Sequence, residues 1–401
     1  MRVGILTGGG DAPGLNAVIY GAVLRASERD DVEVVGIKKG WKLFDMPKED
    51  LTEDVVAKHT EVLDLKKLDY LQSEGGTMLY STRTNPFKDV LKTADDDERE
   101  EIRKQVGIDL AEKMGLLGFD ALIAAGGDDT LGVGAAMYKY GNANVVGCPK
   151  TIDNDLAGTD FTFGFFTGAQ IATTSLEYLI TTAKSHQRIF VVEVMGRDAG
   201  WLTMYSGLGA GSDIILIPET PFNFETDIAE VLKKRVEAGY EYHIIACSEG
   251  AYPTAESLET DFKTINQETI EKLPKDAFGH PNLTELNMAS VIEKELKLRT
   301  DLKSFFTDHD FEYEIRSVVL GHTMRSGPPV VFDRVMGMRF GWHAMGYVLD
   351  GDFGKMASLS GSEIVPTDLV NGSKKKFIGQ DSDLVAIRNA MIAAKCKPKK
   401  E

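Results

Sequence analysis

The stretches ALIAAGGDDT (residues 121–130) and VVGCPKTIDND (residues 145–155) decide the fold that this sequence predicts. Each starts as a short apolar run, which is typical of a strand buried in a parallel sheet, and each ends in an acidic loop. Side chains that follow neighbouring parallel strands meet at one edge of the sheet, where ligands bind. Clustered carboxylates with one lysine suit a magnesium–phosphate complex and a general base better than they suit a protein core. The residues that we expect to meet there are Asp128, Asp129, Lys150, Asp153 and Asp155.

A second strand–loop–helix pattern opens the chain. Val3–Leu6 is apolar, residues 7–14 read TGGGDAPG, and apolar residues then recur at the three- and four-residue spacing of a helix face. The loop matches neither the GxGxxG dinucleotide pattern nor the GxxxxGK phosphate loop. Glycines still let backbone N–H groups approach an anion at a helix N-terminus, so the loop predicts a phosphate contact, with a plain tight turn as the alternative. The residues of the helix face are Leu15, Val18, Ile19, Ala22 and Ala26.

The rest of the chain alternates between predicted strands and predicted helices. This alternation is typical of parallel βαβ units whose sheet is covered on both faces. The acidic run 94–101 is interpreted as the solvated start of a helix that continues to Gly115, and residues 168–184 as another helix. The long polar stretch between Glu249 and Arg316 is expected to be a peripheral insertion. The predicted strands are Val34–Ile37, Ile189–Val194, Ile214–Ile217, His243–Cys247 and Ser317–Leu320.

The bulk composition restricts the possible partners. A chain of 401 residues with 43% hydrophobic and 27% charged residues predicts a globular protein of two α/β domains. The net charge of −17 argues against nucleic acids and anionic membranes as partners. Three widely spaced cysteines build neither a disulfide framework nor a CxxC metal site, no signal-like leader is seen, and no apolar run approaches the ~20 residues that span a bilayer. We therefore expect a cytoplasmic protein. The lysine-rich stretches 374–376 and 397–400 are interpreted as solvated charge without a function.

Seven motifs, taken together, resemble the phosphofructokinase family. They occur in the family's order and span residues 3 to about 340, which is most of the chain. GGDGT-like motifs also occur in related lipid and NAD kinases, whereas TIDND combined with VVEVMGR and LGHxxR is highly specific. The matching stretches are GGGDAPGLN (8–16), GGTMLYSTR (75–83), GGDDT (126–130), PKTIDND (149–155), HQRIFVVEVMGRDAGWLT (186–203), SEGA (248–251) and EIRSVVLGHTMRSGPP (314–329).

The resemblance implies an α/β fold of two Rossmann-like three-layer domains with mainly parallel sheets and an active site in the cleft between them. It implies transfer of a phosphoryl group, with Mg²⁺, to the 1-hydroxyl of fructose 6-phosphate. On this basis residues 1–164 and 324–374 would form the phosphoryl-donor domain. Residues 165–323 and 375–401 would form the fructose 6-phosphate domain.

Family roles can be carried over by position to the acidic and glycine-rich loops. Asp153 would be the general base that takes the proton of the sugar hydroxyl, and Asp128 would be the magnesium carboxylate. Phosphoryl transfer is mainly positioning and charge neutralisation, so arginines, a metal ion and one oriented base are enough for it. The catalytic residues that the resemblance implies are Lys150, Thr151, Asp153, Asp155 and Arg197, and the donor-binding residues are Gly9, Gly10, Arg83, Asp129, Thr130 and Lys150.

A third group of residues would bind the sugar phosphate. In family members, the arginines that match Arg188 and Arg316 reach the 6-phosphate from a neighbouring subunit, so the resemblance implies a homodimer or homotetramer whose subunits complete each other's sites. For His322 the alternative is a histidine buried in the core. The substrate-binding residues implied are Thr151, Asp153, Arg188, Met195, Gly196, Arg197, Glu249, Arg316, His322 and Arg325.

Two positions bear on the phosphoryl donor. Family members that use ATP usually have glycine where Asp129 stands and commonly have glycine where Lys150 stands, so this pair resembles the pyrophosphate-using branch. Asp129 puts a carboxylate where ATP would place its α-phosphate and ribose, and like charges about 4 Å apart repel by roughly 4 kcal/mol at an effective dielectric constant near 20. Lysine also occurs at the second position in some ATP-using members, so Asp129 carries most of the prediction. Pyrophosphate is therefore the expected donor, in a reaction that runs in both directions.

Four other functions are weighed against this prediction. An ATP-dependent phosphofructokinase is the nearest, and a kinase that also accepts sedoheptulose 7-phosphate is the second, because the residues named mainly grip a phosphate and a ketose end. A non-catalytic homologue that binds sugar phosphates is disfavoured, since the residues implied for catalysis are all intact. A nicotinamide-dependent dehydrogenase lacks its glycine fingerprint here.

Overall fold

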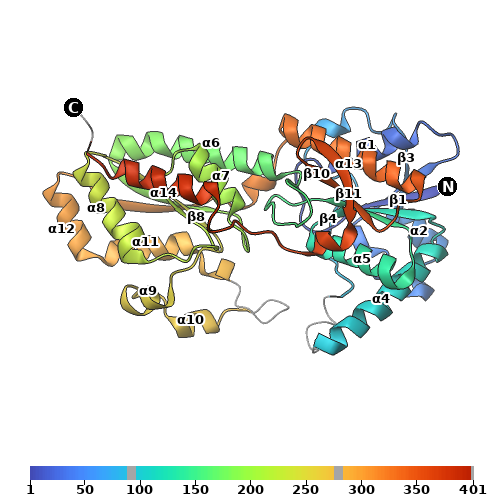
Figure 1. Cartoon of the computed structure of the whole chain (residues 1–401), viewed down its shortest axis with the longest axis horizontal. Coiled ribbons are helices and arrows are strands. Elements are labelled where there is room, and N and C mark those ends of the chain that lie inside the picture. Colours follow the sequence, from blue (N-terminus) through green and yellow to red (C-terminus); the bar gives the residue numbers. More distant parts are fainter. Residues whose placement is uncertain (88–95, 275–282, 399–401) are drawn as a thin grey trace. The chain divides into compact units, whose positions relative to one another are not determined.

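The computed structural model describes residues 1–87, 96–274 and 283–398 as a mixed α/β chain (Figure 1). The described chain divides into two compact units. The first unit comprises Met1–Thr167 with Arg325–Lys376, and the second comprises Gly168–Met324 with Phe377–Glu401. Each unit contains a mainly parallel sheet, which confirms the predicted fold class. Among the described residues, we find no helix that is both long and apolar enough to cross a membrane.

Within the described residues, the sheet of the first unit has seven strands in the order β11-β10-β5-β4-β1-β2-β3. Its inner strands pair in parallel, whereas β3 and β11 join the two edges in antiparallel orientation. The strands are β1 (Arg2–Thr7), β2 (Glu33–Ile37), β3 (Thr60–Leu63), β4 (Ala121–Gly126), β5 (Val145–Pro149), β10 (Lys355–Ser360) and β11 (Glu363–Asp368). The helices are α1 (Leu15–Ala26), α2 (Glu53–His59), α4 (Asp96–Leu116), α5 (Asp128–Gly141) and α13 (Val331–Asp350). The first two residues of the predicted acidic run, 94 and 95, lie outside the described residues.

Alternate residues of the central strands face opposite helical layers. Ala121 and Ile123 of β4 lie in the core that contains the buried faces of α1 and α13. Leu122 and Ala124 lie in the core that contains buried residues of α4 and α5. Because side chains alternate along a strand, burial on both faces explains why the run 121–126 is apolar throughout.

Helices α1 and α13 pack backbone to backbone on one face of this sheet. A Cβ atom at Gly21 would lie 2.1 Å from the carbonyl oxygen of Met338, and one at Gly341 would lie 2.0 Å from the carbonyl oxygen of Val18. Both distances are far inside van der Waals contact, so only glycine permits this approach. The pair therefore anchors the loops that precede the two helices, and those loops carry candidate site residues.

The second unit is built on a parallel sheet of four strands among the described residues, in the order β7-β8-β6-β9. One face of the sheet packs on α8, α11 and α12, and the other on α7 and α14 (Figure 1). The strands are β6 (Arg188–Val194), β7 (Ile214–Leu216), β8 (His243–Ser248) and β9 (Glu314–Val319), as the sequence predicts. The helices are α6 (Phe165–His186), α7 (Trp201–Gly209), the π-helix η4 (Phe224–Ala229), α8 (Glu230–Glu237), α9 (Ala255–Thr260), α10 (Gln267–Glu271), α11 (Met288–Leu298), α12 (Thr300–Asp308) and α14 (Asp383–Lys395).

The prediction that the segment 249–316 is a peripheral insertion is wrong. Ile292 and Leu296 of α11 are buried in the same core as the strands β6 and β8. The backbone N–H of Ala289 also donates to Oε2 of Glu193 in β6 at 3.2 Å. The segment is polar overall because its helices are amphipathic, and their apolar faces complete the second core. Residues 275–282 of the segment lie outside the described residues.

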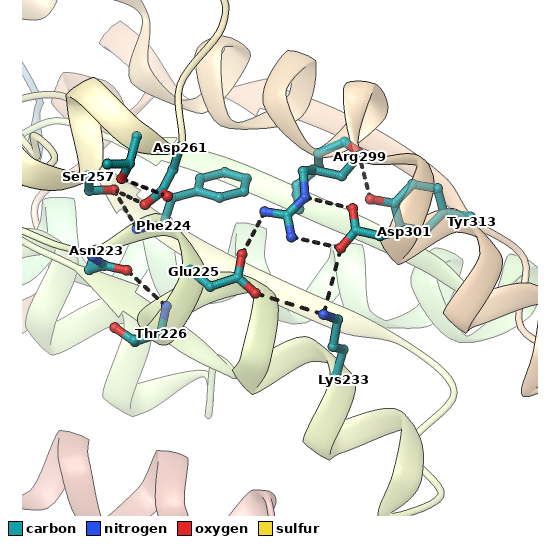
Figure 2. Close-up of polar contacts among 12 residues, drawn as sticks. Asn223, Phe224, Glu225, Thr226, Lys233, Ser257, Asp261, Arg299, Asp301 and Tyr313 are labelled. Carbon is teal, nitrogen blue, oxygen red and sulfur yellow. Dashed lines mark hydrogen bonds and ion pairs between the residues drawn. The ribbon is translucent and has the colours of Figure 1, made fainter.

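A polar network joins this segment to the helices that precede it (Figure 2). Arg299 donates to both carboxylate oxygens of Asp301 at 2.7 Å and pairs with Glu225 of η4 at 2.7 Å. Lys233 of α8 lies 3.8 Å from Glu225 and 3.7 Å from Asp301. The Arg299 guanidinium holds the pKa of Asp301 well below its usual range. Charges of alternating sign therefore connect η4, α8 and the start of α12.

Asp333, in the first turn of α13, is a fully buried carboxyl group. Its Oδ2 accepts hydrogen bonds from the backbone N–H of Thr167 at 2.7 Å and from the Thr167 hydroxyl at 2.6 Å. Burial outweighs these hydrogen bonds and raises the pKa of Asp333 to about 6. The contact joins the start of α13 to the first turn of α6.

The buried Asp333 carboxyl predicts a change of stability in mild acid. A carboxyl whose folded pKa is raised holds more protons when folded than when unfolded, so stability falls as pH rises from the unfolded pKa of 3.8 to the folded pKa of about 6. Across this window we expect the free energy of unfolding of the wild type, relative to Asp333→Asn, to fall by up to about 3 kcal/mol. Urea denaturation of both proteins over this pH range measures the difference. Parallel pH profiles would contradict the prediction.

Candidate active site

The glycine loop after β1 gathers two cationic side chains of the first unit. Lys150 is buried, and its Nζ donates to the carbonyl oxygen of Gly10 at 2.5 Å. Arg325 donates from Nη1 to the carbonyl oxygen of Asp11 at 2.9 Å. A Cβ atom at Gly10 would lie 2.7 Å from that same Nη1, so glycine lets the arginine approach the backbone. The loop therefore has two positive charges beside it, which favour an anion at this place.

The positions of Lys150 and Arg325 bear on their predicted roles. Burial, and after it the nearby charge of Arg325, lower the pKa of Lys150 to about 8. The resemblance implies sugar-phosphate binding for Arg325, whereas its observed contact is with the loop predicted to bind the donor. The assignment of Arg325 to the sugar phosphate stays a prediction.

The acidic motif GGDDT begins helix α5 directly after strand β4. Asp128 and Asp129 stand in the first turn of α5, where carboxylates are favoured by the helix dipole. Thr130 is buried, and a Cβ atom at Gly126 would lie 2.3 Å from its Cβ. A Cβ atom at Gly8 would lie 2.5 Å from Thr130 Oγ1. Thr130 therefore packs between the two loops.

Asp129 has an oriented carboxylate at the surface of the first unit. Its Oδ1 accepts a hydrogen bond from Nδ2 of Asn85 at 3.0 Å. The sequence motifs do not single out Asn85, which comes two residues after the predicted donor-binding Arg83. Arg83 itself is exposed, and its neighbour Thr82 accepts a backbone hydrogen bond from Gly9 at 3.0 Å. The loop 75–85 thus meets both the glycine loop and the acidic motif.

The TIDND loop holds its own side chains in a tight local arrangement. The backbone N–H of Asp153 donates to the hydroxyl of Thr151 at 3.0 Å, and that hydroxyl lies 3.5 Å from Oδ2 of Asp153. Asn154 is fully buried with φ = 53°, in the left-handed region that asparagine tolerates. Its Oδ1 accepts from the backbone N–H of Thr162 at 3.1 Å. These contacts hold the backbone of the TIDND loop and place the Thr151 hydroxyl next to the Asp153 side chain.

Lys375 and Lys376 are not solvated charges, and that interpretation is wrong for both. Nζ of Lys375 lies 3.0 Å from Asp128 Oδ2 and 2.6 Å from Asp155 Oδ2. Nζ of Lys376 donates to the carbonyl oxygen of Asp160 at 2.8 Å, and burial lowers the pKa of Lys376 to about 8. Burial on its own would raise the pKa of Asp128, but the Lys375 ammonium, a backbone hydrogen bond and the charge of Lys150 together outweigh it, so the net pKa is lowered. Of the stretch 397–400, the structure describes only 397 and 398.

The acidic loops fit a magnesium ion that is shared with phosphate. Among the described residues, we find no group of three histidine, cysteine, aspartate or glutamate side chains arranged to hold a metal ion. Mg²⁺ commonly binds one or two protein carboxylates and takes its other ligands from water and substrate phosphates. Asp128 and Asp155 share one ammonium group, so two carboxylates already stand close enough to hold a single cation. The donor set is made of oxygen only, which suits Mg²⁺.

In the second unit, four predicted residues meet after strands β6 and β8. The backbone N–H of Gly196 donates to Oε1 of Glu249 at 3.2 Å, and Gly196 accepts from the hydroxyl of Ser248 at 2.6 Å. A Cβ atom at Gly250 would lie 1.9 Å from the carbonyl oxygen of Arg197, so glycine is required where the loops cross. Arg197 is exposed, with Nε 3.4 Å from Asp198. Met195, half-buried, precedes Gly196.

The other predicted sugar-phosphate residues of the second unit stand at the start of β6, on β9 and directly after β9. His322, in the 3₁₀ turn Gly321–Arg325, is exposed, so the alternative of a buried core histidine is wrong. Arg188 and Arg316 both pair with Glu314, and all three stand on the adjacent strands β6 and β9. Arg188 begins β6 whereas Met195 follows its end, which separates them by roughly 20 Å of extended chain. Within the second unit, Arg188 and Arg316 thus lie away from the loop that carries Met195.

Comparison with known proteins decides the family. The phosphofructokinase family model matches residues 2–348. The chain belongs to the phosphofructokinase family. This phosphofructokinase is 43% identical, over 93% of its chain and 94% of the relative, to the pyrophosphate--fructose 6-phosphate 1-phosphotransferase of Amycolatopsis methanolica. It is 38% identical, over 92% of its chain and 94% of the relative, to the ATP-dependent 6-phosphofructokinase 3 of Streptomyces coelicolor.

A solved structure supports the same family. The crystal structure of Pichia pastoris phosphofructokinase in the T-state matches 98% of this phosphofructokinase with a TM-score of 0.65 at 25% identity. This chain spans 36% of the length of that longer chain. Because relatives named for both donors occur at similar identity, the choice of donor has to be argued from the site.

Proposed function

We propose that this phosphofructokinase transfers a phosphoryl group from pyrophosphate to the 1-hydroxyl of fructose 6-phosphate, giving fructose 1,6-bisphosphate and phosphate. The observation that carries the proposal is an exposed Asp129 carboxylate, oriented by Asn85, in the same acidic and glycine-loop region as the buried Lys150. The relative named a pyrophosphate-dependent phosphotransferase supports the same donor. The reaction exchanges a phosphoanhydride for a phosphate ester of closer energy, so we expect it to be reversible.

The first unit supplies the donor-binding residues in this proposal. Backbone groups of Gly9 and Gly10 contact the donor phosphates, and Lys150 gives a flexible point charge to a small anionic donor. Arg83, exposed on the loop that bonds to Gly9, neutralises charge on the transferring group. Thr130 holds the glycine loop against the acidic motif. Together these groups recognise phosphate without needing a nucleoside.

Asp153 acts as the general base in the proposed reaction. Its carboxylate takes the proton from the sugar hydroxyl while that oxygen attacks the phosphorus atom. The Thr151 hydroxyl accepts from the backbone N–H of Asp153 at 3.0 Å and lies 3.5 Å from the carboxylate, so it helps to position the base. Asp155, which pairs with Lys375, is a further catalytic residue of the proposal, and Arg197 stabilises the charge of the transferring group.

Magnesium is the divalent ion that we propose for this site, with Asp128 as its protein carboxylate. When bound, the ion neutralises charge on the donor phosphates and positions them. Asp128 contributes by its place in the first turn of α5, directly after a buried strand, which fixes the carboxylate relative to the glycine loop. Lys375 keeps that carboxylate paired with a positive charge.

The second unit supplies the groups that we propose for fructose 6-phosphate. Glu249 is held by the backbone of Gly196 and offers a carboxylate to sugar hydroxyls. Met195 and the exposed His322 complete the contribution of the second unit, and Arg325, which belongs to the first unit, is the remaining residue that we propose for the sugar phosphate. Arg188 and Arg316, which share Glu314 at a distance from Met195, serve the 6-phosphate of a neighbouring subunit in a homodimer or homotetramer. The enzyme acts in the cytoplasm.

The second candidate function is an ATP-dependent phosphofructokinase. The relative from Streptomyces coelicolor that is named for ATP supports it at 38% identity. A wider acceptor range that includes sedoheptulose 7-phosphate is compatible with either donor, because the grip is on a phosphate and a ketose end. The choice of donor therefore separates the two main candidates.

A coupled assay with each donor tests the proposed function. Purified enzyme with fructose 6-phosphate and Mg²⁺ is supplied with pyrophosphate or with ATP, and the formation of fructose 1,6-bisphosphate is followed. We expect kcat/KM to be higher with pyrophosphate, and we expect the enzyme to form fructose 6-phosphate from fructose 1,6-bisphosphate and phosphate. Activity with ATP at least equal to that with pyrophosphate would overturn the proposal.

A further inference from the structure

Lys375 holds two carboxylates of the candidate donor site with one ammonium group. Its Nζ lies 2.6 Å from Oδ2 of Asp155 and 3.0 Å from Oδ2 of Asp128. The Asp155 side chain is 7% exposed and that of Lys375 is 30% exposed, so the pairs are partly shielded from water. The two carboxylates therefore share an internal cation.

The backbone places Lys375 at this point. Leu156 and Lys375 form an antiparallel bridge, and the N–H of Lys376 donates to the carbonyl oxygen of Asp155 at 2.7 Å. The Lys376 side chain holds this bridge in place by donating to the carbonyl oxygen of Asp160 at 2.8 Å. A solvated lysine would need none of these contacts. The stretch 374–376 is thus bonded to the acidic loop through its backbone and side chains, although about 220 residues separate the two in sequence.

The charge of this region must be rearranged when the donor binds. The Lys375 ammonium cannot stay 3.0 Å from the Asp128 oxygen once that oxygen ligates a divalent cation, because the two cations repel. When the donor binds, its phosphates bring negative charge into this region and can become the new partner of the Lys375 ammonium. Pyrophosphate has no nucleoside to contact, so its affinity depends on the cations around its phosphates.

We propose that Lys375 determines the affinity for pyrophosphate: it balances Asp128 and Asp155 in the free enzyme and moves onto the phosphate oxygens when the metal–donor complex binds. This inference rests on the proposed function and adds a residue to it. Two effects of opposite sign follow when the charge is removed. The donor binds more weakly because it loses an ammonium contact, and a free metal ion binds more tightly because it loses a competitor.

The test compares Lys375→Met with Lys374→Met, which removes the same charge from an exposed neighbour whose Nζ contacts Asn371 at 3.3 Å. For Lys375→Met we expect KM for pyrophosphate to rise by about tenfold to a hundredfold, the range of one charge-assisted hydrogen bond. KM for fructose 6-phosphate should stay close to that of the wild type. Lys374→Met should match the wild type in both constants.

A titration with Mn²⁺ alone gives a readout that needs no turnover. In calorimetry without donor or sugar phosphate, we expect Lys375→Met to bind Mn²⁺ about twofold to fivefold more tightly than the wild type, as the loss of one partly exposed competing pair implies. Lys375→Arg keeps the charge, so its affinity for Mn²⁺ and its KM for pyrophosphate should stay near those of the wild type. This variant also decides the question if Lys375→Met does not fold.

Each outcome supports the inference or overturns it. An unchanged KM for pyrophosphate in Lys375→Met overturns it, as does an equal rise of both KM values with a lower Tm, which marks a merely structural lysine. If Lys375→Met does not fold, a large rise in the KM of Lys375→Arg for pyrophosphate has the same meaning. If the wild type uses ATP and not pyrophosphate, the proposed function fails, and the Mn²⁺ titration still shows whether Lys375 competes for the carboxylates.

Discussion

Replacing Asp153 by asparagine should lower kcat by about a hundredfold to ten-thousandfold, the contribution of a general base. The amide has the shape of the carboxylate but cannot take the proton of the sugar hydroxyl. The backbone hydrogen bond from residue 153 to Thr151 at 3.0 Å does not depend on the side chain, so the loop should keep its conformation. KM for fructose 6-phosphate should therefore change little.

Steady-state kinetics of Asp153→Asn with pyrophosphate measures this effect. The matched control is Asp160→Asn. Asp160 is exposed, and its Oδ2 accepts a hydrogen bond from the backbone N–H of Gly361 at 2.6 Å. The amide oxygen of asparagine can accept the same hydrogen bond. We expect the control to keep the wild-type kcat. Turnover at the wild-type rate by Asp153→Asn would remove Asp153 from the role of base.

The second large effect concerns the choice of donor. In the double variant Asp129→Gly, Lys150→Gly, the ratio of kcat/KM for ATP to that for pyrophosphate should rise. A carboxylate about 4 Å from a phosphate costs roughly 1 kcal/mol in water and roughly 4 kcal/mol at an effective dielectric constant near 20. Because Asp129 is exposed, we expect a rise between about fivefold and a thousandfold. Most of it should come from Asp129.

Single variants separate charge from structure in this experiment. Asp129→Ala removes the carboxylate without the helix cost of glycine in α5, so it should reproduce most of the shift. Lys150 is buried, so Lys150→Gly also leaves a cavity and should lower stability. Asn85→Ala keeps the charge of Asp129 but loses its orienting hydrogen bond, and should have a smaller effect. An unchanged donor ratio in the double variant would show that other groups select the donor.

The parallel strands other than β10, which the sequence analysis missed, could be predicted because their pattern is local. The apolar run 121–126 has no alternation, and β4 is buried on both faces. The edge strands β3 and β11 were not predicted. An antiparallel strand at the edge of a mainly parallel sheet depends on pairing with the neighbouring strand, which its own sequence does not show. The stretch 249–316 misled for a related reason: a high average polarity hid the apolar faces of amphipathic helices such as α11.

The candidate site divides in the same way. Asp128, Asp129 and Lys150 come from motifs that are contiguous in the chain, so residue type and spacing were enough to propose them. Asn85 and Lys375 carry no motif, and they join the site only by hydrogen bonds to carboxylates far away in sequence. A lysine in a basic stretch is read as solvated unless the fold places an acid beside it.

The sequence by itself determined the parallel α/β framework, the acidic loops after β4 and β5, and the family. These follow from local patterns, because strand burial, glycine turns and motif spacing are properties of neighbouring residues. The tertiary structure alone decided that Lys375 is the counter-cation of Asp128 and Asp155, and that 249–316 belongs to the core. Both depend on contacts between distant parts of the chain, where burial and charge are set by the partner that the fold supplies.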